Sequence, residues 1–393
     1  YGKGPGVDRS GDPLKHGSYG GAAEHGGVIV LCGDDHAARS STIAHQSDHA
    51  LIHFGIPVFN PAHVQDYLDF GIYAFALSRY SGSWAGFKCV TDTVESSASV
   101  SAEIQRVQIK LPTDYELPPG GLNIRMGVVP LAAESRQLDM RLEAVKAFVR
   151  ANGLDKQIIG GPGRKRLGIV TTGKATMDVI EALRALGVDD AAARSLGVGV
   201  YKVGVSWPIE PQGVRAFASE CDEILVIEEK RPVIEEQLAH VLYNLPADRR
   251  PRLTGKRDLS GAPLVAQTGE LAPSHVKEAL HRRLAANGVE TRSEQGAEPT
   301  PNAPAAPASN LVRMPSFCAG CPHNTSTRVP DGSIAMGGIG CHGLAVWMPE
   351  RKTVALHHMG GEGAAWIGQA PFVETDHIFQ NLGDGTYFHS GLL

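Results

Sequence analysis

The sequence predicts an α/β protein built from several doubly wound domains. Between residues 166 and 245, short apolar stretches alternate with segments of helical periodicity. The predicted strands, such as Leu167–Thr171 and Ile224–Ile227, are continuous Val, Ile and Leu runs, as parallel strands covered on both faces require. A chain of 393 residues is long enough for two or three such domains, each with its own core.

The other elements of this region follow in order along the chain. We expect a helix at Ala175–Leu186, a strand at Val198–Val205, a short helix from Pro211 and a helix at Pro232–Leu245. Strand and helix thus alternate throughout, which is the pattern of a doubly wound sheet.

The first hundred residues begin with glycine-rich loop sequence, Gly4–Gly21, followed by predicted strands at Gly27–Cys32 and Gly86–Thr91. Polar residues follow the first strand, where an open sheet places its ligand loop. They are Asp34, Asp35, Ser40, Ser41, Thr42 and Gln46. For Asp34 and Asp35, two interpretations stay open: capping of the loop, or a role at a cofactor or a domain interface.

Residues 102–134 show no sustained period and are interpreted as a connecting segment. A helix follows, because Leu138, Leu142, Val145 and Phe148 recur at helical spacing, with Gly153 as its stop. Residues 287–310 are rich in Ala, Pro, Glu and Ser without periodicity, which is typical of a linker.

The composition narrows the class of protein. The chain is 42% apolar and 20% charged, with a net charge of −5, so it is expected to be globular and to bind no nucleic acid, which attracts a basic surface. We find no run of about 18 uncharged apolar residues and no signal sequence. We therefore expect no membrane association and a cytoplasmic location.

Three of the six cysteines, Cys32, Cys89 and Cys221, lie singly in strand-like segments and are expected to be buried as small apolar residues. The other three form a C-x2-C pair, Cys318 and Cys321, followed by Cys341. Soft thiolates select iron–sulfur clusters or zinc, and three of them leave one position for a further ligand.

Three other uses of these cysteines fit the sequence to different degrees. A zinc site with His323 or His342 as the fourth ligand stays open. A c-type haem site does not fit, because Pro322 separates Cys321 from the histidine. A thioredoxin-like pair fits poorly, because that motif follows a strand of a βαβ unit and needs no third cysteine.

The tripeptide Gly383-Asp384-Gly385 lies between a predicted strand, His377–Leu382, and a segment that can start a helix, Thr386–Leu393. An aspartate in this position can hold Mg²⁺ that bridges two phosphates, although the tripeptide alone is more often a turn. Just upstream, Met359–Gly363 offers another glycine-rich backbone that a ligand can approach closely.

Four motifs in order, CAGCPH, GGIGCH, HMGGEGAAWIGQ and HIFQNLGDGTYFHSG, closely resemble the pyrophosphate-binding domain of the indolepyruvate ferredoxin oxidoreductases, especially their long single-chain bacterial form. These are thiamine-diphosphate-dependent 2-oxoacid:ferredoxin oxidoreductases. The segments GVDRSGD and HGGVIVLCGDDHAARSSTIAHQSDHA resemble the later part of the family's pyrimidine-binding domain, and the middle α/β region resembles its transketolase C-terminal-like domain.

The resemblance implies a division of the chain into five parts. They are the end of a pyrimidine domain (1–101), a connecting segment (102–165), a transketolase C-terminal-like domain (166–286), a linker (287–310) and the start of a pyrophosphate domain (311–393). It also implies that the sequence is a fragment that is inactive alone. The fourth cluster cysteine and a second Mg²⁺ ligand would lie beyond Leu393, and the activating glutamate before Tyr1.

The resemblance also implies roles for individual residues. Cys318, Cys321 and Cys341 would bind a 4Fe-4S cluster, and Asp384 would bind Mg²⁺. The positions expected to bind thiamine diphosphate are Gly338, Gly340, His342, Gly361, Glu362, Gly363, Gly383, Asp384 and Gly385. His342 and His389 are candidate proton carriers. No catalytic residue is assigned.

The implied reaction is oxidative decarboxylation of an aryl 2-oxoacid, such as indolepyruvate, to an acyl-CoA, with electrons passed to ferredoxin. The implied partners are the 2-oxoacid, coenzyme A, ferredoxin and further copies of the chain in a homo-oligomer. Two alternatives stay open: an oxidoreductase for pyruvate or another aliphatic 2-oxoacid, and a non-catalytic zinc-binding module. A non-redox thiamine decarboxylase would need no thiolate cluster.

Overall fold

The computed structural model describes residues 2–39, 41, 43–125, 127, 129–291 and 316–390. The chain divides into two compact units, Tyr1–Gln295 and Gly296–Leu393. Several predictions lie outside the described residues: Ser40, Thr42, most of the linker, the first residues of the pyrophosphate domain, Leu393 and the His389 side chain. Within the described ranges, no helix is long and apolar enough to cross a membrane.

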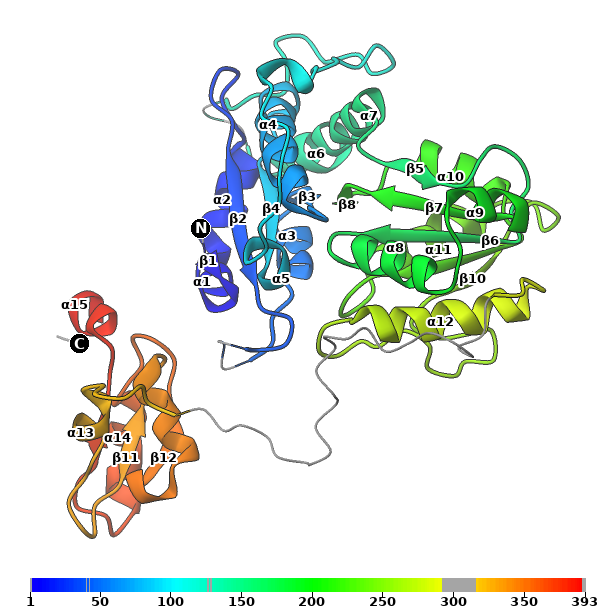
Figure 1. Ribbon diagram of the computed structural model, residues 1–393. Coiled ribbons are helices and arrows are strands. Elements are labelled where there is room, and N and C mark those ends of the chain that lie inside the picture. Colours follow the sequence, from blue (N-terminus) through cyan, green and yellow to red (C-terminus); the bar gives the residue numbers. More distant parts are fainter. Residues whose placement is uncertain are drawn as a thin grey trace. The chain divides into compact units, whose positions relative to one another are not determined.

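The first unit contains two five-stranded sheets (Figure 1). The first sheet has the order β1-β2-β4-β3-β8, in which all pairs are parallel except β3 with β8. Its strands are β1 (Gly2–Lys3), β2 (Ile29–Asp34), β3 (Val58–Phe59), β4 (Ala85–Val90) and β8 (Val205–Trp207).

Helices cover both faces of this first sheet. On one face, Phe70 and Leu77 of α4 and Phe148 of α7 pack with Phe59 and Phe87. On the other face, Val7, Leu51 and Phe54 pack with Cys32 and Val58. The helices are α1 (Gly4–Arg9), α2 (Gly11–Gly20), α3 (Asp48–His53), α4 (Val64–Ser81), α5 (Thr91–Val94), α6 (Pro130–Ser135) and α7 (Leu142–Asn152).

The second sheet has the order β10-β9-β6-β7-β5, and only the edge strand β5 is antiparallel to its neighbour. Its strands are β5 (Lys156–Ile159), β6 (Leu167–Thr172), β7 (Val198–Val203), β9 (Glu223–Ile227) and β10 (Arg252–Thr254). Every residue of β6, β7 and β9 is buried. This confirms the prediction from their continuous apolar runs.

The second sheet is also covered on both faces. Val179 and Leu183 of α8 and Leu280 of α12 pack on one face, whereas Phe217 of α10 and Leu238 of α11 pack on the other. The helices are α8 (Ala175–Ala185), α9 (Asp190–Leu196), α10 (Pro211–Ser219), α11 (Ile234–Tyr243) and α12 (Pro273–Ala286). The predicted doubly wound α/β class is therefore confirmed for this region.

The predicted strand Val198–Val205 is divided in the structure. The chain leaves the second sheet after β7 and enters the first sheet as β8, with Gly204 between them. A Cβ atom at Gly204 would lie 2.7 Å from the carbonyl oxygen of Leu154, so the crossing requires glycine. This change of sheet was not predicted, because the apolar run of the sequence continues through the crossing.

Two further predictions need correction. The segment Gly4–Gly21, expected to be a loop, forms α1 and α2, because Pro5 opens the first helix and buried Val7 anchors it against the sheet. The helix expected from Leu138 begins as a π-helical segment, Arg136–Arg141, before α7. Gly153 ends α7 in the left-handed conformation, as predicted.

The isolated cysteines behave largely as expected. Cys32 and Cys221 are buried, and Cys89 is partly buried. Burial raises the pKa of Cys89 to about 11 and that of Cys221 to about 12, so both thiols stay protonated at neutral pH.

The second unit contains a smaller parallel sheet of order β12-β11-β13. Its strands are β11 (Ala335–Gly337), β12 (Thr353–Leu356) and β13 (Phe379–Gln380). The helices are α13 (His323–Ser326), α14 (Ala364–Gln369) and α15 (Asp384–Ser390), with 3-10 turns at Cys341–Trp347, Pro349–Arg351 and Ala370–Phe372. The predicted last strand is shorter than expected, and the helix after it begins at Asp384.

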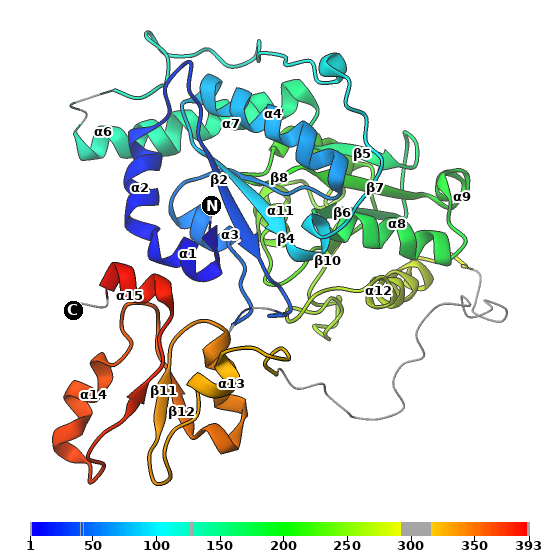
Figure 2. The same ribbon diagram turned by 60° about the vertical axis from the view of Figure 1, so that its left-hand side comes forward.

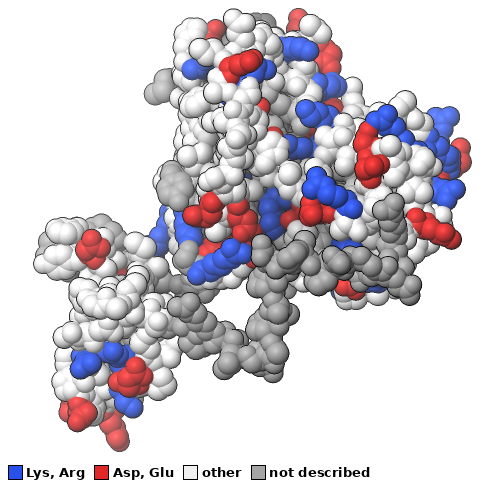
Figure 3. Space-filling model, in the orientation of Figure 1, with Lys and Arg blue, Asp and Glu red and all other residues white. Residues whose placement is uncertain are grey.

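Lys and Arg side chains are interspersed with Asp and Glu side chains on the face of the molecule drawn in Figure 3.

Candidate functional site

Three glycine-rich motifs meet at one edge of the small sheet in the second unit. Because β12, β11 and β13 are parallel, the residues that follow them lie at the same edge. Gly338–His342 follows β11, His357–Gly363 follows β12, and Gly383–Gly385 lies after β13. This is the edge at which an open α/β sheet binds ligands.

Glu362 joins these motifs. Its Oε1 accepts a hydrogen bond of 2.9 Å from the hydroxyl of Thr386, and its Oε2 accepts one of 2.7 Å from the amide of Gly360. A Cβ atom at Gly338 would overlap Glu362 Oε1, so the carboxylate lies directly against the Gly338 backbone. Glycine at position 338 therefore allows this contact between the loops.

His342 is buried beside the same backbone. Its Nε2 accepts a hydrogen bond of 3.2 Å from the amide of Gly338, which requires the unprotonated Nε2. Burial lowers the pKa of His342, and the neighbouring His323 lowers it further. A Cβ atom at Gly340 would lie 2.9 Å from the His342 ring. His342 thus stays neutral near pH 7 and orders the loop after β11.

The other predicted positions leave open backbone at this edge. Gly363 has φ +82°, a conformation that favours glycine, and a Cβ atom at Gly385 would meet nothing within 4 Å. A Cβ atom at Gly361 would overlap the His358 ring. Asp384 is exposed at the start of α15. Its carboxylate oxygens are ligands that Mg²⁺ prefers.

The predicted cluster cysteines lie on loops of the same unit. Cys318 and Cys341 are exposed, Cys321 is half-buried, and all three are free thiols. The amide of Cys321 donates to the carbonyl of Cys318 at 3.0 Å, which closes a tight turn. Cys321 Sγ lies 3.1 Å from Nδ1 of His323.

The described residues contain no group of three or more His, Cys, Asp or Glu side chains placed to hold a metal ion. The chemistry of the three thiols suits a soft metal or an iron–sulfur cluster, but their arrangement is not that of a complete site. The same holds for Asp384, which belongs to no such group in the part of the chain that the structure describes. Metal sites often form only when the metal binds, because ligation and folding are coupled.

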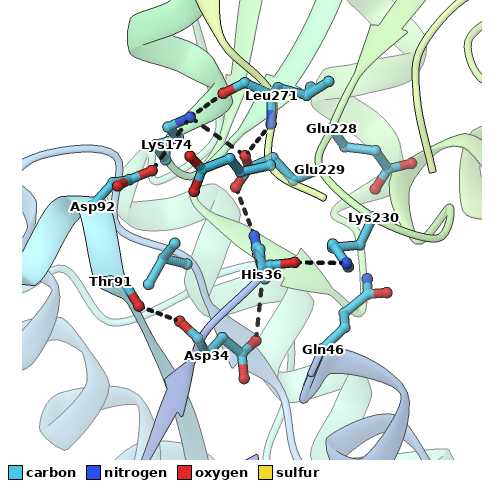
Figure 4. Close-up of polar contacts among 12 residues, drawn as sticks. Asp34, His36, Gln46, Thr91, Asp92, Lys174, Glu228, Glu229, Lys230 and Leu271 are labelled. Carbon is cyan, nitrogen blue, oxygen red and sulfur yellow. Dashed lines mark hydrogen bonds and ion pairs between the residues drawn. The ribbon is translucent and has the colours of Figure 1, made fainter. Parts of the chain in front are cut away.

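The first unit holds a buried charged cluster that the sequence did not single out, apart from Asp34 (Figure 4). His36 Nδ1 lies 2.7 Å from Glu229 Oε2, and His36 Nε2 lies 3.7 Å from Asp34 Oδ2. Lys174 Nζ lies 3.4 Å from Glu229 Oε1 and 3.6 Å from Asp92 Oδ2. These residues follow β2, β4, β6 and β9, so the carboxyl ends of both sheets contribute.

The charges in this cluster stabilise one another. Burial alone would lower the pKa of His36, but the carboxylates of Asp34 and Glu229 outweigh it and raise that pKa. Burial alone would raise the pKa of Glu229, but His36 and Lys174 lower it to about 2. The cluster thus joins the two sheets through charged rather than neutral groups.

Asp34 also contacts a second buried cation. Lys88 Nζ lies 2.6 Å from Asp48 Oδ2 and 3.5 Å from Asp34 Oδ2. The amide and hydroxyl of Ser47 both donate to Asp34 Oδ2 at 3.0 Å. Asp35 instead accepts hydrogen bonds of 2.8 Å from Arg39 N and Ser41 Oγ. Asp34 therefore lies at the junction of the sheets, and Asp35 caps its loop.

A small polar cavity lies inside this cluster, with a volume of about 20 Å³ and walls that include His36, Asn60, Lys174 and Glu229. His36 Nε2 and Asn60 Oδ1 line it and have no hydrogen-bond partner among the described residues. The volume is enough for one water molecule and too small for a substrate. We interpret the cluster as a structural junction between the sheets.

Comparison with known proteins finds sequence matches to one family. Residues 156–300 match a sequence family described as "Indolepyruvate oxidoreductase domain". The chain is 27% identical to the indolepyruvate oxidoreductase subunit IorA of Pyrococcus horikoshii, over 94% of this chain and 57% of that protein. The IorA subunit of Methanothermobacter thermautotrophicus is 25% identical, over 93% of this chain and 56% of that protein.

Solved structures give more distant matches. A 2-oxoglutarate:ferredoxin oxidoreductase from Magnetococcus marinus, with 2-oxoglutarate, coenzyme A and succinyl-CoA bound, matches with a TM-score of 0.45 and 15% identity, over 72% of this chain and 52% of that one. A split-gene transketolase, an inactive β4 tetramer, matches with a TM-score of 0.37 and 17% identity, over 66% of each chain.

The α/β sheets and the sequence matches together define a relative of the 2-oxoacid oxidoreductases. Within that class the chain is similar to the indolepyruvate oxidoreductases, and the resemblance predicted from its motifs is confirmed. The chain spans a little over half the length of the IorA subunits that it matches.

Proposed function

We propose that the chain is part of an oxidoreductase that oxidatively decarboxylates an aryl 2-oxoacid, such as indolepyruvate, to an acyl-CoA and passes the electrons to ferredoxin. The proposal is supported by one observation above the others. Three motifs separated in sequence meet at the carboxyl edge of β12-β11-β13, in a chain similar to IorA subunits over nearly all of its length.

Thiamine diphosphate and Mg²⁺ are the proposed cofactors at this edge. When bound, thiamine diphosphate supplies a carbanion that cleaves the bond between the carboxyl and oxo carbons of a 2-oxoacid. The loops fit a phosphate-bearing ligand, because Gly363, Gly383 and Gly385 keep side chains away from the edge. Asp384 is the proposed Mg²⁺ ligand, and its exposed carboxylate is available for that role.

The neighbouring side chains of this edge would hold the loops in place. Glu362 bonds both Thr386 in α15 and Gly360 in the loop after β12, so it fixes the distance between these two segments. His342 fixes the loop after β11 by accepting from Gly338. Neither group is assigned a proton transfer.

Cys318, Cys321 and Cys341 are the proposed ligands of a 4Fe-4S cluster in the complete protein. The choice depends on the chemistry of three free thiols near one another in sequence and on the family of the chain. A further ligand from outside this sequence would complete the set.

We also propose the five-part domain division given above. The complete protein is proposed to be a long single chain that forms a homo-oligomer in the cytoplasm.

The test is an assay of the purified complete enzyme with ferredoxin as acceptor. The proposal predicts ferredoxin reduction that requires both indolepyruvate and coenzyme A, with formation of the corresponding acyl-CoA. Pyruvate and other aliphatic 2-oxoacids are the matched controls. Turnover of pyruvate in preference to indolepyruvate would support an oxidoreductase for aliphatic 2-oxoacids instead, and no ferredoxin reduction with either substrate would contradict the proposal.

A zinc-binding module is the second candidate, because Cys321 Sγ lies 3.1 Å from Nδ1 of His323 and a Cys–His pair is typical of zinc sites. Metal and acid-labile sulfide analysis after anaerobic purification separates the two. Iron with sulfide in equal amounts supports the cluster. Zinc without sulfide supports the module.

A further inference from the structure

A second cavity of the first unit lies far in sequence from the proposed cofactor residues. It occupies about 560 Å³ in the first unit, within the size range of pockets for small organic molecules. Its walls come from α2, from α6 and from the π-helical segment Arg136–Arg141. Figure 2 shows α2 and α6 next to each other.

Three arginines contribute to this cavity, and all of them bond to oxygens that carry no charge. Arg141 is fully buried and donates to the carbonyls of Leu122, Ser18, Tyr19 and Gly20 and to the side-chain amide oxygen of Gln137.

The other two arginines hold the loop before α6. Arg136 donates to the carbonyls of Gly121 and Asn123, and Arg125 to those of Pro119, Gly120 and Gly121. Through these hydrogen bonds the arginines order the end of α2 and the loop before α6. Because the acceptors are uncharged oxygens, the bonds do not neutralise the positive charges of the arginines.

Positive charge therefore accumulates at this cavity. None of the three arginines forms an ion pair with a carboxylate in the part of the chain that the structure describes, and Lys15 adds a further cation to the walls. Burial, together with the neighbouring charge of Arg136, lowers the pKa of Arg141 to about 10, yet the group stays charged at neutral pH. Glu134 is the one carboxylate among the wall residues.

The π-helical segment explains why two of these arginines share one wall. In a π-helix the backbone bonds join residues five apart, so positions 136 and 141 lie above one another, whereas an α-helix would turn them to different sides. Arg136 Nε is buried and has no hydrogen-bond partner among the described residues. It is a donor without an acceptor at a site of excess positive charge.

The remaining wall is apolar. It consists of Tyr19, Pro130, Leu131 and Ala133, and the Leu131 side chain is 78% exposed. A site with several cations on one side and an aromatic and aliphatic surface on the other is complementary to a molecule that has an anionic group and an apolar body. Guanidinium groups bind carboxylate, sulfonate and phosphate groups with charge-assisted hydrogen bonds.

We propose that this cavity binds a small organic anion, with one carboxylate, sulfonate or phosphate group held by the cations and an apolar body against Tyr19 and Leu131. The site shares no residue with the edge of β12-β11-β13. It therefore does not depend on the proposed function, and failure of either proposal leaves the other standing.

The test uses two fluorescent probes of nearly the same shape with the 393-residue chain. Anilinonaphthalene sulfonate carries an anionic group, and N-phenylnaphthylamine lacks it. We expect the sulfonate to bind at about one site per chain and about tenfold more tightly than the uncharged probe, which is the effect of a single charge-assisted hydrogen bond. Added salt should weaken the binding of the sulfonate only.

Variants identify the site. Lys15→Gln combined with Arg125→Gln should weaken sulfonate binding by about tenfold and leave the uncharged probe unaffected. Leu131→Asp should weaken both probes. Arg184→Gln is the matched control, because Arg184 is exposed on α8 and pairs with Glu181. Far-ultraviolet circular dichroism checks that each variant is folded.

Unchanged sulfonate affinity in the Lys15→Gln/Arg125→Gln variant would overturn the proposal. Equal affinities of the two probes for the unmodified chain would also overturn it, because the site would then be apolar without selecting an anion. Binding at many weak sites, insensitive to all three variants, would assign the fluorescence to the general surface and exclude the cavity.

Discussion

Replacement of Lys88 by methionine tests the buried charged cluster in the first unit. Lys88 is 3% exposed, and its Nζ lies 2.6 Å from Asp48 Oδ2 and 3.5 Å from Asp34 Oδ2. Both carboxylates are also buried, so the substitution leaves them without their main cation. Removing one partner of a buried ion pair costs about 3–5 kcal/mol of folding free energy, because the remaining charge is desolvated and uncompensated.

The assay is denaturant unfolding of the 393-residue chain at neutral pH. Lys146→Met is the matched control, because Lys146 pairs with Glu143 on the surface of α7, where an ion pair contributes less than about 1 kcal/mol. The double variant Lys88→Met/Asp48→Leu should recover part of the loss, since it removes both charges of the closest pair. If Lys88→Met costs no more than Lys146→Met, the cluster does not stabilise the junction of the sheets as we argue.

Three further predictions concern other parts of the chain. The pKa of His36 in the folded chain lies above its ordinary value of 6.5. The difference in unfolding free energy between the unmodified chain and His36→Gln should therefore be largest below about pH 6.5 and should fall as the pH rises through the folded pKa. A difference that does not change with pH would contradict this. Gly338→Ala should displace Glu362 and speed hydrogen exchange at the Gly360 amide by about fivefold, which is the effect of losing one hydrogen bond. Gly368→Ala is the control and should not change this exchange, because its new Cβ would have nothing within 4 Å. Equal exchange rates in the two variants would contradict the contact between Gly338 and Glu362. In the complete enzyme, Cys318→Ser or Cys321→Ser should abolish ferredoxin reduction and spare most thiamine diphosphate binding, and reduction at the unmodified rate would exclude these thiols as cluster ligands.

The sequence carried enough information to predict the three central strands of the second sheet, β6, β7 and β9, and the last strand of the small sheet, β13. The strands β6 and β9 are apolar runs bounded by Gly173 and Pro232, and local patterns of this kind do not depend on distant contacts. Strands β11 and β12 were not predicted, so the sequence did not show that the glycine motifs meet at one edge. Helix α12 was missed, since its apolar residues lie among many charged ones.

The charged cluster was missed because its members are distant in sequence. His36 and Glu229 are 193 positions apart, and only the folding of two sheets against each other brings them to 2.7 Å. A signal was nevertheless present, because His36, Lys174 and Glu229 each follow the end of a strand by two residues. Long-range placement of this kind also explains why the sequence could not foresee the change of sheet at Gly204 or the cavity lined by Arg136 and Arg141.

Calorimetric titration of the complete enzyme with thiamine diphosphate tests the proposed cofactor site. With Mg²⁺ present, we predict that Asp384→Asn binds thiamine diphosphate at least about tenfold more weakly than the unmodified enzyme, because a carboxylate ligand of the cation is lost. Asp331→Asn, which changes another exposed carboxylate of the same unit, should bind normally. Undiminished, Mg²⁺-dependent affinity in the folded Asp384→Asn variant would contradict the assignment of the cofactor to the edge of β12-β11-β13.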